Sequence, residues 1–174
     1  QRGAIHSTLD AVWGFSQVEV DESTAELLQM VARRGILRPR VLYMGPKQGP
    51  GLFQSYMDAS FRPVRGPDEE EFLSIFMDDI CISTEAYEGD SDDDIVERHI
   101  KHCICFLEAA RSKKIQFKLA KCHWAQLEIQ LLGFRITQGT RKVDPKKAES
   151  MRQWPEPRSI DDVQSFLAFA NFVR

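Results

Sequence analysis

The sequence predicts an α+β domain in which helices back a small antiparallel sheet. Two short apolar runs, 72–76 and 80–82, flank Asp78-Asp79 and fit a tight hairpin with the carboxylates at its tip. Apolar residues recur over 95–111 at the spacing of an amphipathic helix. Because 174 residues with 43% hydrophobic composition suffice for one core, we expect a compact domain.

The first two strands are expected on either side of Gly14. Residues 5–9 fit a strand that ends at Asp10, and apolar and polar residues alternate over 15–20. We therefore expect two short strands with Asp10 between them.

A glycine-rich loop is expected to lead into the first helix. The segment 42–51 combines glycine and proline with polar residues, which is typical of a loop. Pro50 suits the first helical turn, because a backbone N–H there would have no helical partner. The expected apolar face of the helix consists of Leu52, Phe53, Tyr56, Met57 and Phe61.

Acidic residues precede the long amphipathic helix. Residues 89–94 are too polar to pack and predict a solvated loop. Beyond the helix, 131–136 predict a short strand and Gln138-Gly139 a turn.

Two helices are expected near the C-terminal end. A helix over 146–154 precedes Pro155 and Pro157, which separate it from the next. The second helix begins at Ser159, and Asp161 and Asp162 suit the dipole of its first turn.

Charge is divided unevenly along the chain. The net charge is −3, yet residues 1–100 carry nine Lys/Arg against nineteen Asp/Glu, and residues 101–174 carry fourteen against seven. A basic run without acids follows the long helix, either as a solvated surface or as a track for a nucleic-acid backbone. Its members are Arg111, Lys113, Lys114, Lys118 and Lys121.

The sequence lacks membrane and secretory features. No stretch approaches the roughly 20 apolar residues of a membrane helix, and the first residues given do not combine a basic region with an apolar one. The four cysteines form no disulfide framework and are expected as buried thiols. We expect an intracellular protein of the cytoplasm or nucleus, and Gln1 in place of Met indicates a fragment of a longer chain.

Asp10, Asp78 and Asp79 have the residue types of a two-metal site. Two Mg²⁺ ions roughly 3.5–4 Å apart neutralise the attacking and leaving oxygens of phosphoryl transfer. Mg²⁺ prefers carboxylates from separate segments together with substrate phosphates. Any single Asp-Asp pair can instead be a surface turn, but an apolar strand on each side places this pair at the edge of a core.

Zinc is a second metal interpretation. The spacing of the candidate ligands lacks a Cys-x-x-Cys pair and puts several of them on the expected helix, so we disfavour it. These residues are His99, His102, Cys103, Cys105, Cys122 and His123.

Several motifs together resemble those of reverse transcriptases. Phe76-Met77-Asp78-Asp79 resembles the Tyr/Phe-x-Asp-Asp box of that family, and residues 8–18 resemble its first catalytic box, in which an aromatic residue follows an Asp by five positions. The remaining similar segments are the second box at 42–54, the Lys-Cys segment at 119–122, the Leu-Gly strand at 131–134 and the run from 144 to 167. Their order is similar to that in gypsy-type LTR retrotransposons and retroviruses.

This resemblance implies the palm of a right-hand polymerase over 1–138 and a truncated connection to the thumb over 139–174, with the fingers largely absent. It implies an RNA-directed DNA polymerase that extends a DNA primer on an RNA or DNA template with deoxynucleoside triphosphates. Two Mg²⁺ ions, or Mn²⁺, would be its cofactors. The remainder of a Pol polyprotein would be its partner, in a cytoplasmic virus-like particle or the nucleus and not in a membrane.

The resemblance also assigns roles at the catalytic centre. Asp10 and Asp78 would hold the metal ions, with Asp79 in support. Lys121 would donate a proton to the pyrophosphate leaving group, although it can equally be a solvated lysine. Phe15 would exclude a 2′-hydroxyl from the nucleotide site. The alternative is that its ring only packs in the core.

Other residues are assigned to the substrates. The expected nucleotide-binding residues beside Phe15 are Gln17, Met44, Gly45, Lys47 and Met77, and for Gln17 a strand residue without a role is the alternative. The expected primer- and template-binding residues are Gln54, Lys113, Lys114, Lys118, Leu132 and Gly133.

Some positions depart from the family pattern. Leu27, Met44, Pro46 and Ala168 stand where the family usually has other residues, and Pro46 removes a backbone donor from the nucleotide loop. A catalytically dead remnant that binds RNA or protein is therefore the alternative to the enzyme. An unrelated metal-dependent phosphohydrolase or nuclease would need further acids or a histidine at the hairpin.

Overall fold

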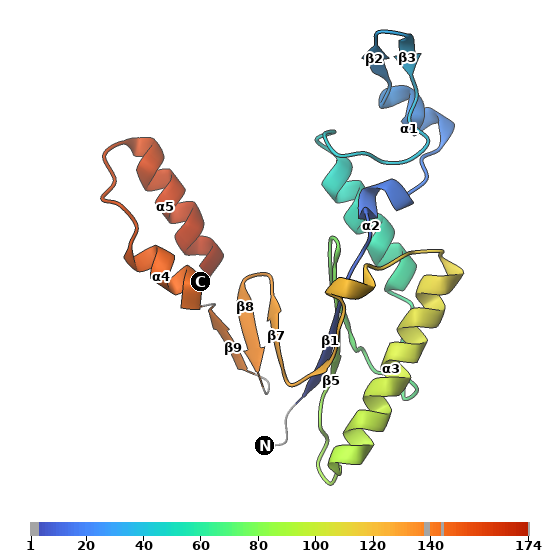
Figure 1. Ribbon diagram of the computed structural model, residues 1–174, viewed down its shortest axis with the longest axis vertical. Coiled ribbons are helices and arrows are strands. Elements are labelled where there is room, and N and C mark those ends of the chain that lie inside the picture. The colour runs from blue at the N-terminus through green and yellow to red at the C-terminus, as the bar shows by residue number, and fades with distance from the viewer. Residues whose placement is uncertain (1–3, 138–139, 144, 174) are drawn as a thin grey trace.

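A four-stranded antiparallel sheet in the order β4-β5-β1-β6 forms the centre of the protein, as the computed structural model shows (Figure 1). The structure describes residues 4–137, 140–143 and 145–173. The strands of this sheet are β1 (Ile5–Asp10), β4 (Leu73–Phe76), β5 (Asp79–Thr84) and β6 (His123–Gln126). β1 pairs with β5 along its whole length, so two segments about 70 residues apart in sequence form the middle of the sheet.

Two helices, α2 (Gly49–Phe61) and α3 (Asp92–Ser112), pack on the sheet. The core between them and the sheet is aromatic, and the rings of Phe61 and Phe106 lie 5.0 Å apart. Ile80 and Ile82 of β5 are fully buried beneath these rings, as alternation along a strand with one buried face requires. The helices therefore hold one face of β5 against a dry core.

The remaining elements extend from this centre. Figure 1 shows the hairpin β2–β3 at one end of the molecule, and α4 and α5 beyond the sheet β7-β8-β9. These elements are α1 (Glu22–Leu27), β2 (Met30–Ala32), β3 (Gly35–Leu37), β7 (Glu128–Leu131), β8 (Phe134–Thr137), β9 (Thr140–Val143), α4 (Pro145–Arg152) and α5 (Ile160–Val173), with the 3₁₀ helices η1 (Gly14–Gln17) and η2 (Leu119–Lys121). Trp154 stacks on Phe169 at 5.0 Å and joins α4 to α5. Among the described helices, none has the length and apolar character needed to cross a membrane.

Several expected elements are confirmed. β4 and β5 form the tight hairpin, and Pro50 lies in the first turn of α2. The apolar face of α2 buries Phe53, Met57 and Phe61, whereas the expectation that Leu52 shares this face was wrong, because its side chain is 45% exposed. The two C-terminal helices also form, and Ser159 accepts a hydrogen bond from the Asp162 N–H as an N-cap does.

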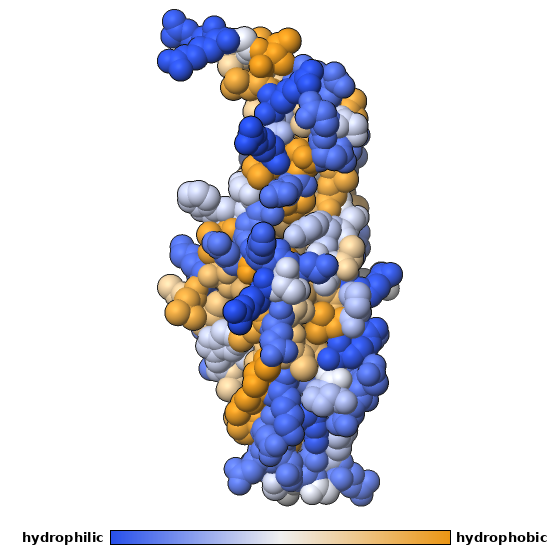
Figure 2. Space-filling model, turned by 90° about the vertical axis from the view of Figure 1, so that its right-hand side faces the viewer, coloured by the Kyte–Doolittle hydropathy of each residue, from blue (hydrophilic) through white to orange (hydrophobic). Residues whose placement is uncertain are grey.

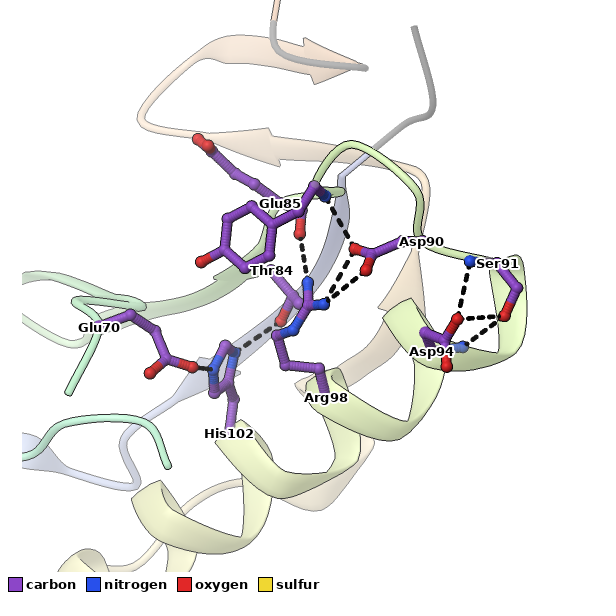
Figure 3. A network of polar contacts seen from close by, with 9 residues as sticks. Glu70, Thr84, Glu85, Asp90, Ser91, Asp94, Arg98 and His102 are labelled. Atoms are coloured by element: carbon purple, nitrogen blue, oxygen red, sulfur yellow. Dashed lines mark hydrogen bonds and ion pairs between the residues drawn. The ribbon is translucent and has the colours of Figure 1, made fainter. Parts of the chain in front are cut away.

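The acidic segment 89–94 is only partly a loop, so the expectation of a loop up to residue 94 was wrong. α3 begins at Asp92, and Ser91 and Asp94 form a capping box in which each side chain bonds the backbone of the other (Figure 3). The negative charges of the first-turn aspartates interact favourably with the positive end of the helix dipole. This interaction stabilises the first turn and explains why residues too polar to pack are nevertheless helical.

Two of the strand predictions were wrong. Residues 14–17 form η1 in place of a strand, because Trp13 adopts a left-handed conformation (φ 47°) that ends the extended chain. Residues 131–136 are divided between β7 and β8 by a turn in which Leu132 and Gly133 have positive φ values of 50° and 77°. The expected turn at Gln138-Gly139 lies outside the described residues.

A chain of buried polar contacts fixes α3 on the sheet. His99 contacts Ser7 Oγ of β1 through Nε2 and Thr84 Oγ1 of β5 through Nδ1, both at 2.7 Å. Thr84 Oγ1 also lies 2.8 Å from His102 Nδ1, and Figure 3 shows His102 between Thr84 and the carboxylate of Glu70. One helix thereby contacts both central strands through two imidazoles. These contacts satisfy groups whose burial would otherwise cost free energy.

Acid should weaken this chain of contacts. His99 is 3% exposed, and burial together with the neighbouring His102 and His6 lowers its pKa from 6.5 to about 4. The unfolded chain therefore binds more protons between these pH values, so stability is complete above pH 6.5 and falls as the pH decreases to about 4. We expect a loss on the order of 3 kcal/mol in the free energy of unfolding, measured by urea titration at several pH values.

His99→Gln is the matched control, because glutamine keeps a donor and an acceptor but does not titrate. The variant should be less stable than the wild type at pH 7 and should lose less stability between pH 6.5 and 4. Parallel pH profiles for the two proteins would contradict the role of His99.

Candidate catalytic carboxylate site

The antiparallel pairing of β1 with β5 brings Asp10 and Asp79 together. They are opposite each other in the register, at the last pair of the two strands. The ladder continues by one hydrogen bond, which the Ala11 N–H donates to the Asp78 carbonyl at 3.2 Å. Because directly opposed residues point to the same face of a sheet, the carboxylates of Asp10 and Asp79 share one face.

Asp78 lies in the two-residue turn between β4 and β5. Its Oδ1 atom is buried and has no hydrogen-bond partner among the described residues. A Cβ atom at Gly14 would lie 2.0 Å from this oxygen and 2.7 Å from Cζ of Phe53. The carboxylate therefore has its present position only because residue 14 has no side chain.

The carboxylates repel one another. Burial and then the charges of Asp10 and Asp79 raise the pKa of Asp78 above its ordinary value. Asp79 lies at the exposed end of β5, and partial burial of its carboxylate followed by the charge of Asp10 likewise raises its pKa. Lys121 opposes both shifts, but one ammonium group neutralises only part of the charge of three carboxylates.

Lys121 contacts the first carboxylate directly. Its Nζ donates a hydrogen bond to Asp10 Oδ2 at 2.8 Å, and this bond together with the charge of Asp10 raises the pKa of Lys121. The side chains are 55% and 27% exposed, so solvent screens the ion pair. Its position follows from η2, which lies beside β1.

A divalent cation would complement this excess of negative charge. Within residues 4–137, 140–143 and 145–173, no three carboxylate, imidazole or thiolate groups form a ready metal cluster. The orphaned Oδ1 of Asp78 and the mutual repulsion of the carboxylates nevertheless fit a site for a hard cation, which prefers oxygen ligands.

Gln54 holds the hairpin turn from α2. Its Oε1 accepts the Met77 N–H at 2.7 Å, and its Nε2 donates to Asp58 and to the Ile75 carbonyl. Met77 has a positive φ of 55°, a conformation that is costly for a residue with a side chain. The contact therefore stabilises the turn that carries Asp78, so Gln54 faces the hairpin.

Phe15 and Gln17 lie in η1, directly after the first carboxylate. Phe15 is 9% exposed, and its ring stacks on Phe53 at 4.9 Å. The amide of Gln17 donates to the carbonyls of Val12 and Gln116 and accepts the Gln116 N–H at 2.7 Å. Gln17 thus joins the segment after β1 to the segment after α3.

The other predicted substrate residues lie on loops around these elements. Met44 and Lys47 precede α2, where Met44 is 76% exposed, and Gly45 has a φ of 132° that favours glycine. Leu132 and Gly133 form the β7–β8 turn. Lys113 and Lys114 directly follow α3, and the Lys118 N–H donates to the Asp10 carbonyl at 2.9 Å. This backbone hydrogen bond places Lys118 beside the carboxylate segment.

A cleft of about 230 Å³ lies beside the carboxylates. Its lining includes residues that the sequence interpretation did not assign to a substrate, His123 of β6 and Gln130 of β7. His123 is opposite Thr8 in the register and so lies on the same face as Asp10. Gly14 was also missed, since a glycine four positions after an aspartate signals a break more readily than a close approach.

The family comparison matches most of the chain. Residues 1–136 match the model described as reverse transcriptase (RNA-dependent DNA polymerase). The retrovirus-related Pol polyprotein from transposon opus of Drosophila melanogaster is 26% identical over 168 residues, which are 97% of this chain and 16% of that protein. The enzymatic polyprotein of cauliflower mosaic virus (strain D/H) is 26% identical over 97% of this chain and 23% of its own length. The chain thus spans less than a quarter of these relatives.

Solved structures show the same fold. A foamy viral protease-reverse transcriptase in complex with double-stranded DNA aligns with a TM-score of 0.78 and 23% identity, over 100% of this chain and 28% of that one. A foamy viral protease-reverse transcriptase in complex with an RNA/DNA hybrid aligns with a TM-score of 0.71 and 22% identity, over 98% of this chain and 21% of that one. Together with the family match, which covers well over half of its length, this establishes that the chain belongs to the reverse transcriptase (RNA-dependent DNA polymerase) family.

Proposed function

We propose that the chain supplies the catalytic carboxylates of an RNA-directed DNA polymerase, which adds deoxynucleotides to the 3′-hydroxyl of a primer. The observation that carries this proposal is the register pair Asp10–Asp79, with Asp78 in the adjoining turn. Two distant segments thereby contribute carboxylates to one place, as two-metal phosphoryl transfer requires. Family membership supports the same reaction and disfavours the inactive remnant.

Asp10 and Asp78 are assigned as the metal-binding residues, with Asp79 as a supporting carboxylate. Two divalent ions, when bound, neutralise charge on the attacking and leaving oxygens. We assign Mg²⁺, with Mn²⁺ as a substitute, because both suit carboxylate oxygens. The buried, unpartnered Oδ1 of Asp78 supports this choice.

Lys121 is assigned as the proton donor to the pyrophosphate leaving group. A lysine amine carries its proton at neutral pH, and the contact with Asp10, which raises its pKa, holds that proton until charge develops on the leaving group. Its 2.8 Å contact with Asp10 keeps the ammonium beside the carboxylates. The lysine therefore supplies both charge balance and a transferable proton.

The nucleotide site is assigned to the residues that follow β1 and precede α2. The buried ring of Phe15 would lie against the deoxyribose and exclude a 2′-hydroxyl, while Gln17 would hold the neighbouring backbone. The loop and turn residues assigned to the nucleotide and template base are Met44, Gly45, Lys47 and Met77.

A template with a DNA primer is the proposed macromolecular substrate. The foamy viral structures with double-stranded DNA and with an RNA/DNA hybrid support this assignment. Lys113, Lys114 and Lys118 would contact the phosphate backbone, and the Leu132-Gly133 turn the primer end. Gln54 would act indirectly, through the turn that it holds.

The proposed parent is a Pol polyprotein, since the relatives are several times longer than this chain. We assign residues 1–138 to the palm and 139–174 to the connection with the thumb. The proposed site of action is a virus-like particle in the cytoplasm, or the nucleus.

Removal of one carboxylate charge should abolish primer extension. Asp78→Asn keeps the size of the side chain but not its charge, so in the parent polyprotein we expect extension on an RNA template to fall by about two to three orders of magnitude. Asp161→Asn on α5 is the control and should leave the rate unchanged. Equal extension by the Asp78→Asn protein and the wild type would exclude the metal role.

Gly14→Ala should displace the Asp78 carboxylate and the Phe53 ring, which the new methyl group would overlap. We expect a loss of roughly 1–3 kcal/mol in the free energy of unfolding and about ten-fold weaker binding of Mn²⁺, measured by electron paramagnetic resonance. The corresponding position for comparison is Gly51, which has open space around it within α2. Gly51→Ala should be neutral or stabilising by up to about 1 kcal/mol, with unchanged Mn²⁺ binding; an equal effect of both variants would refute the close-approach argument.

Phe15→Ala should open the nucleotide site to ribonucleotides. We expect the ratio of ribonucleotide to deoxynucleotide incorporation to rise at least about ten-fold, since the excluded 2′-hydroxyl would gain space. Phe53→Leu loosens the same aromatic stack without removing Phe15 and should change the ratio much less. An unchanged ratio in Phe15→Ala would show that the ring has only a core role.

A further inference from the structure

α3 has a second apolar side that faces away from the sheet. Its inner side buries Ile95, His99, His102, Phe106 and Ala110. On the outer side, four aliphatic residues are between 40% and 52% exposed, which is unusual for adjacent large side chains on one helix face. They are Val96, Ile100, Ile104 and Leu107. Figure 2 shows a hydrophobic stripe on this face of the molecule, in its lower half where α3 lies.

The stripe ends in opposite charges. Asp93 precedes it in the first helical turn, and Arg111 follows it in the last. At 100° per residue, the two charged residues lie on the same line along α3 as the aliphatic ones. Along the stripe and its two charged ends, the residues are therefore spaced by three or four positions, in the order Asp93, Val96, Ile100, Ile104, Leu107, Arg111.

This order is nearly symmetric about the centre of the helix, at residue 102. An antiparallel copy of α3 would place Ile100 against Ile104 of the second copy and Val96 against Leu107 of the second copy. Asp93 would face Arg111 of the second copy, and twofold symmetry would form this ion pair twice. A surface whose apolar residues and charges are complementary to themselves favours a copy of the same chain over an unrelated partner.

We propose that the outer face of α3 is a self-association surface, on which two copies of this chain pack their α3 helices antiparallel about a twofold axis near residue 102. The spacing of three and four residues is that of helix pairs packed with interlocking side chains. Antiparallel helices also align their dipoles favourably. This dimer does not depend on the proposed polymerase activity.

The inner side of α3 fixes how this surface is presented. His99 and His102 bond to β1, β5 and the Glu70 segment, so α3 cannot rotate to bury the stripe in its own core. Among the described element pairs, α3 packs on the sheet and on α2, which contact its inner side. The contact offered by one helix is small, and we therefore expect a reversible dimer at micromolar concentrations.

Analytical ultracentrifugation of the 174-residue chain, at about 10–300 µM, tests the proposal. The wild type should show a monomer–dimer equilibrium, and Ile100→Lys should raise the dissociation constant at least about ten-fold. Ile160→Lys is the matched control, because it adds the same charge in place of an isoleucine that is 78% exposed on α5. It should leave the equilibrium unchanged, and circular dichroism should show that both variants remain folded.

A charge exchange distinguishes the antiparallel arrangement from other contacts. Asp93→Arg and Arg111→Asp should each weaken the dimer at least about ten-fold, because each places like charges opposite one another twice. The double variant restores opposite charges across the interface and should return the dissociation constant to within about three-fold of the wild type. A monomer throughout the concentration range, a dimer insensitive to Ile100→Lys, or no recovery in the double variant would overturn the proposal.

Discussion

The pairing of β1 with β5 is the constraint on which the carboxylate site depends. Asp10 and Asp79 are 69 positions apart, and they meet because they are the last opposed pair of an antiparallel ladder. In a strand, a shift of one residue turns every side chain to the opposite face. Such a shift would point Asp10 away from Asp79, so the proposed chemistry would require this register as strictly as it requires the acids themselves.

The buried polar chain from Ser7 to Glu70 explains how the register is specified. Ser7 belongs to β1 and Thr84 to β5, and His99 of α3 contacts both at 2.7 Å. A slipped strand would leave these hydroxyl groups and an imidazole buried without partners, at a cost of about 1–3 kcal/mol for each. The imidazoles therefore contribute specificity at one end of the strands, while the carboxylates lie at the other.

Local patterns predicted the elements that depend on local chemistry. The β4–β5 hairpin, α2 and α3 followed from apolar periodicity and turn residues, and the three carboxylates followed from their positions between strands. The two strand predictions that failed lie where single non-glycine residues adopt positive φ, at Trp13 and Leu132, because such conformations are uncommon for these residue types and apolar periodicity does not signal them. The role of Gly14 was missed for a related reason: the close approach of Asp78 involves a residue 64 positions away.

The clustered carboxylates that the proposed function needs lower the stability of the fold. Burial and the neighbouring charges raise the pKa of Asp78 and of Asp79 beside a single lysine, and Asp78 buries an oxygen without a described partner. Such an arrangement weakens the fold, and the surrounding contacts must compensate for it: Gln54 bonds the strained turn and Gly14 leaves room for the carboxylate. A cation that binds these oxygens would relieve the repulsion and stabilise the folded chain in proportion to its affinity. Metal binding would thus be coupled to the stability of the hairpin. Lys121 already neutralises part of the carboxylate charge through its ion pair with Asp10.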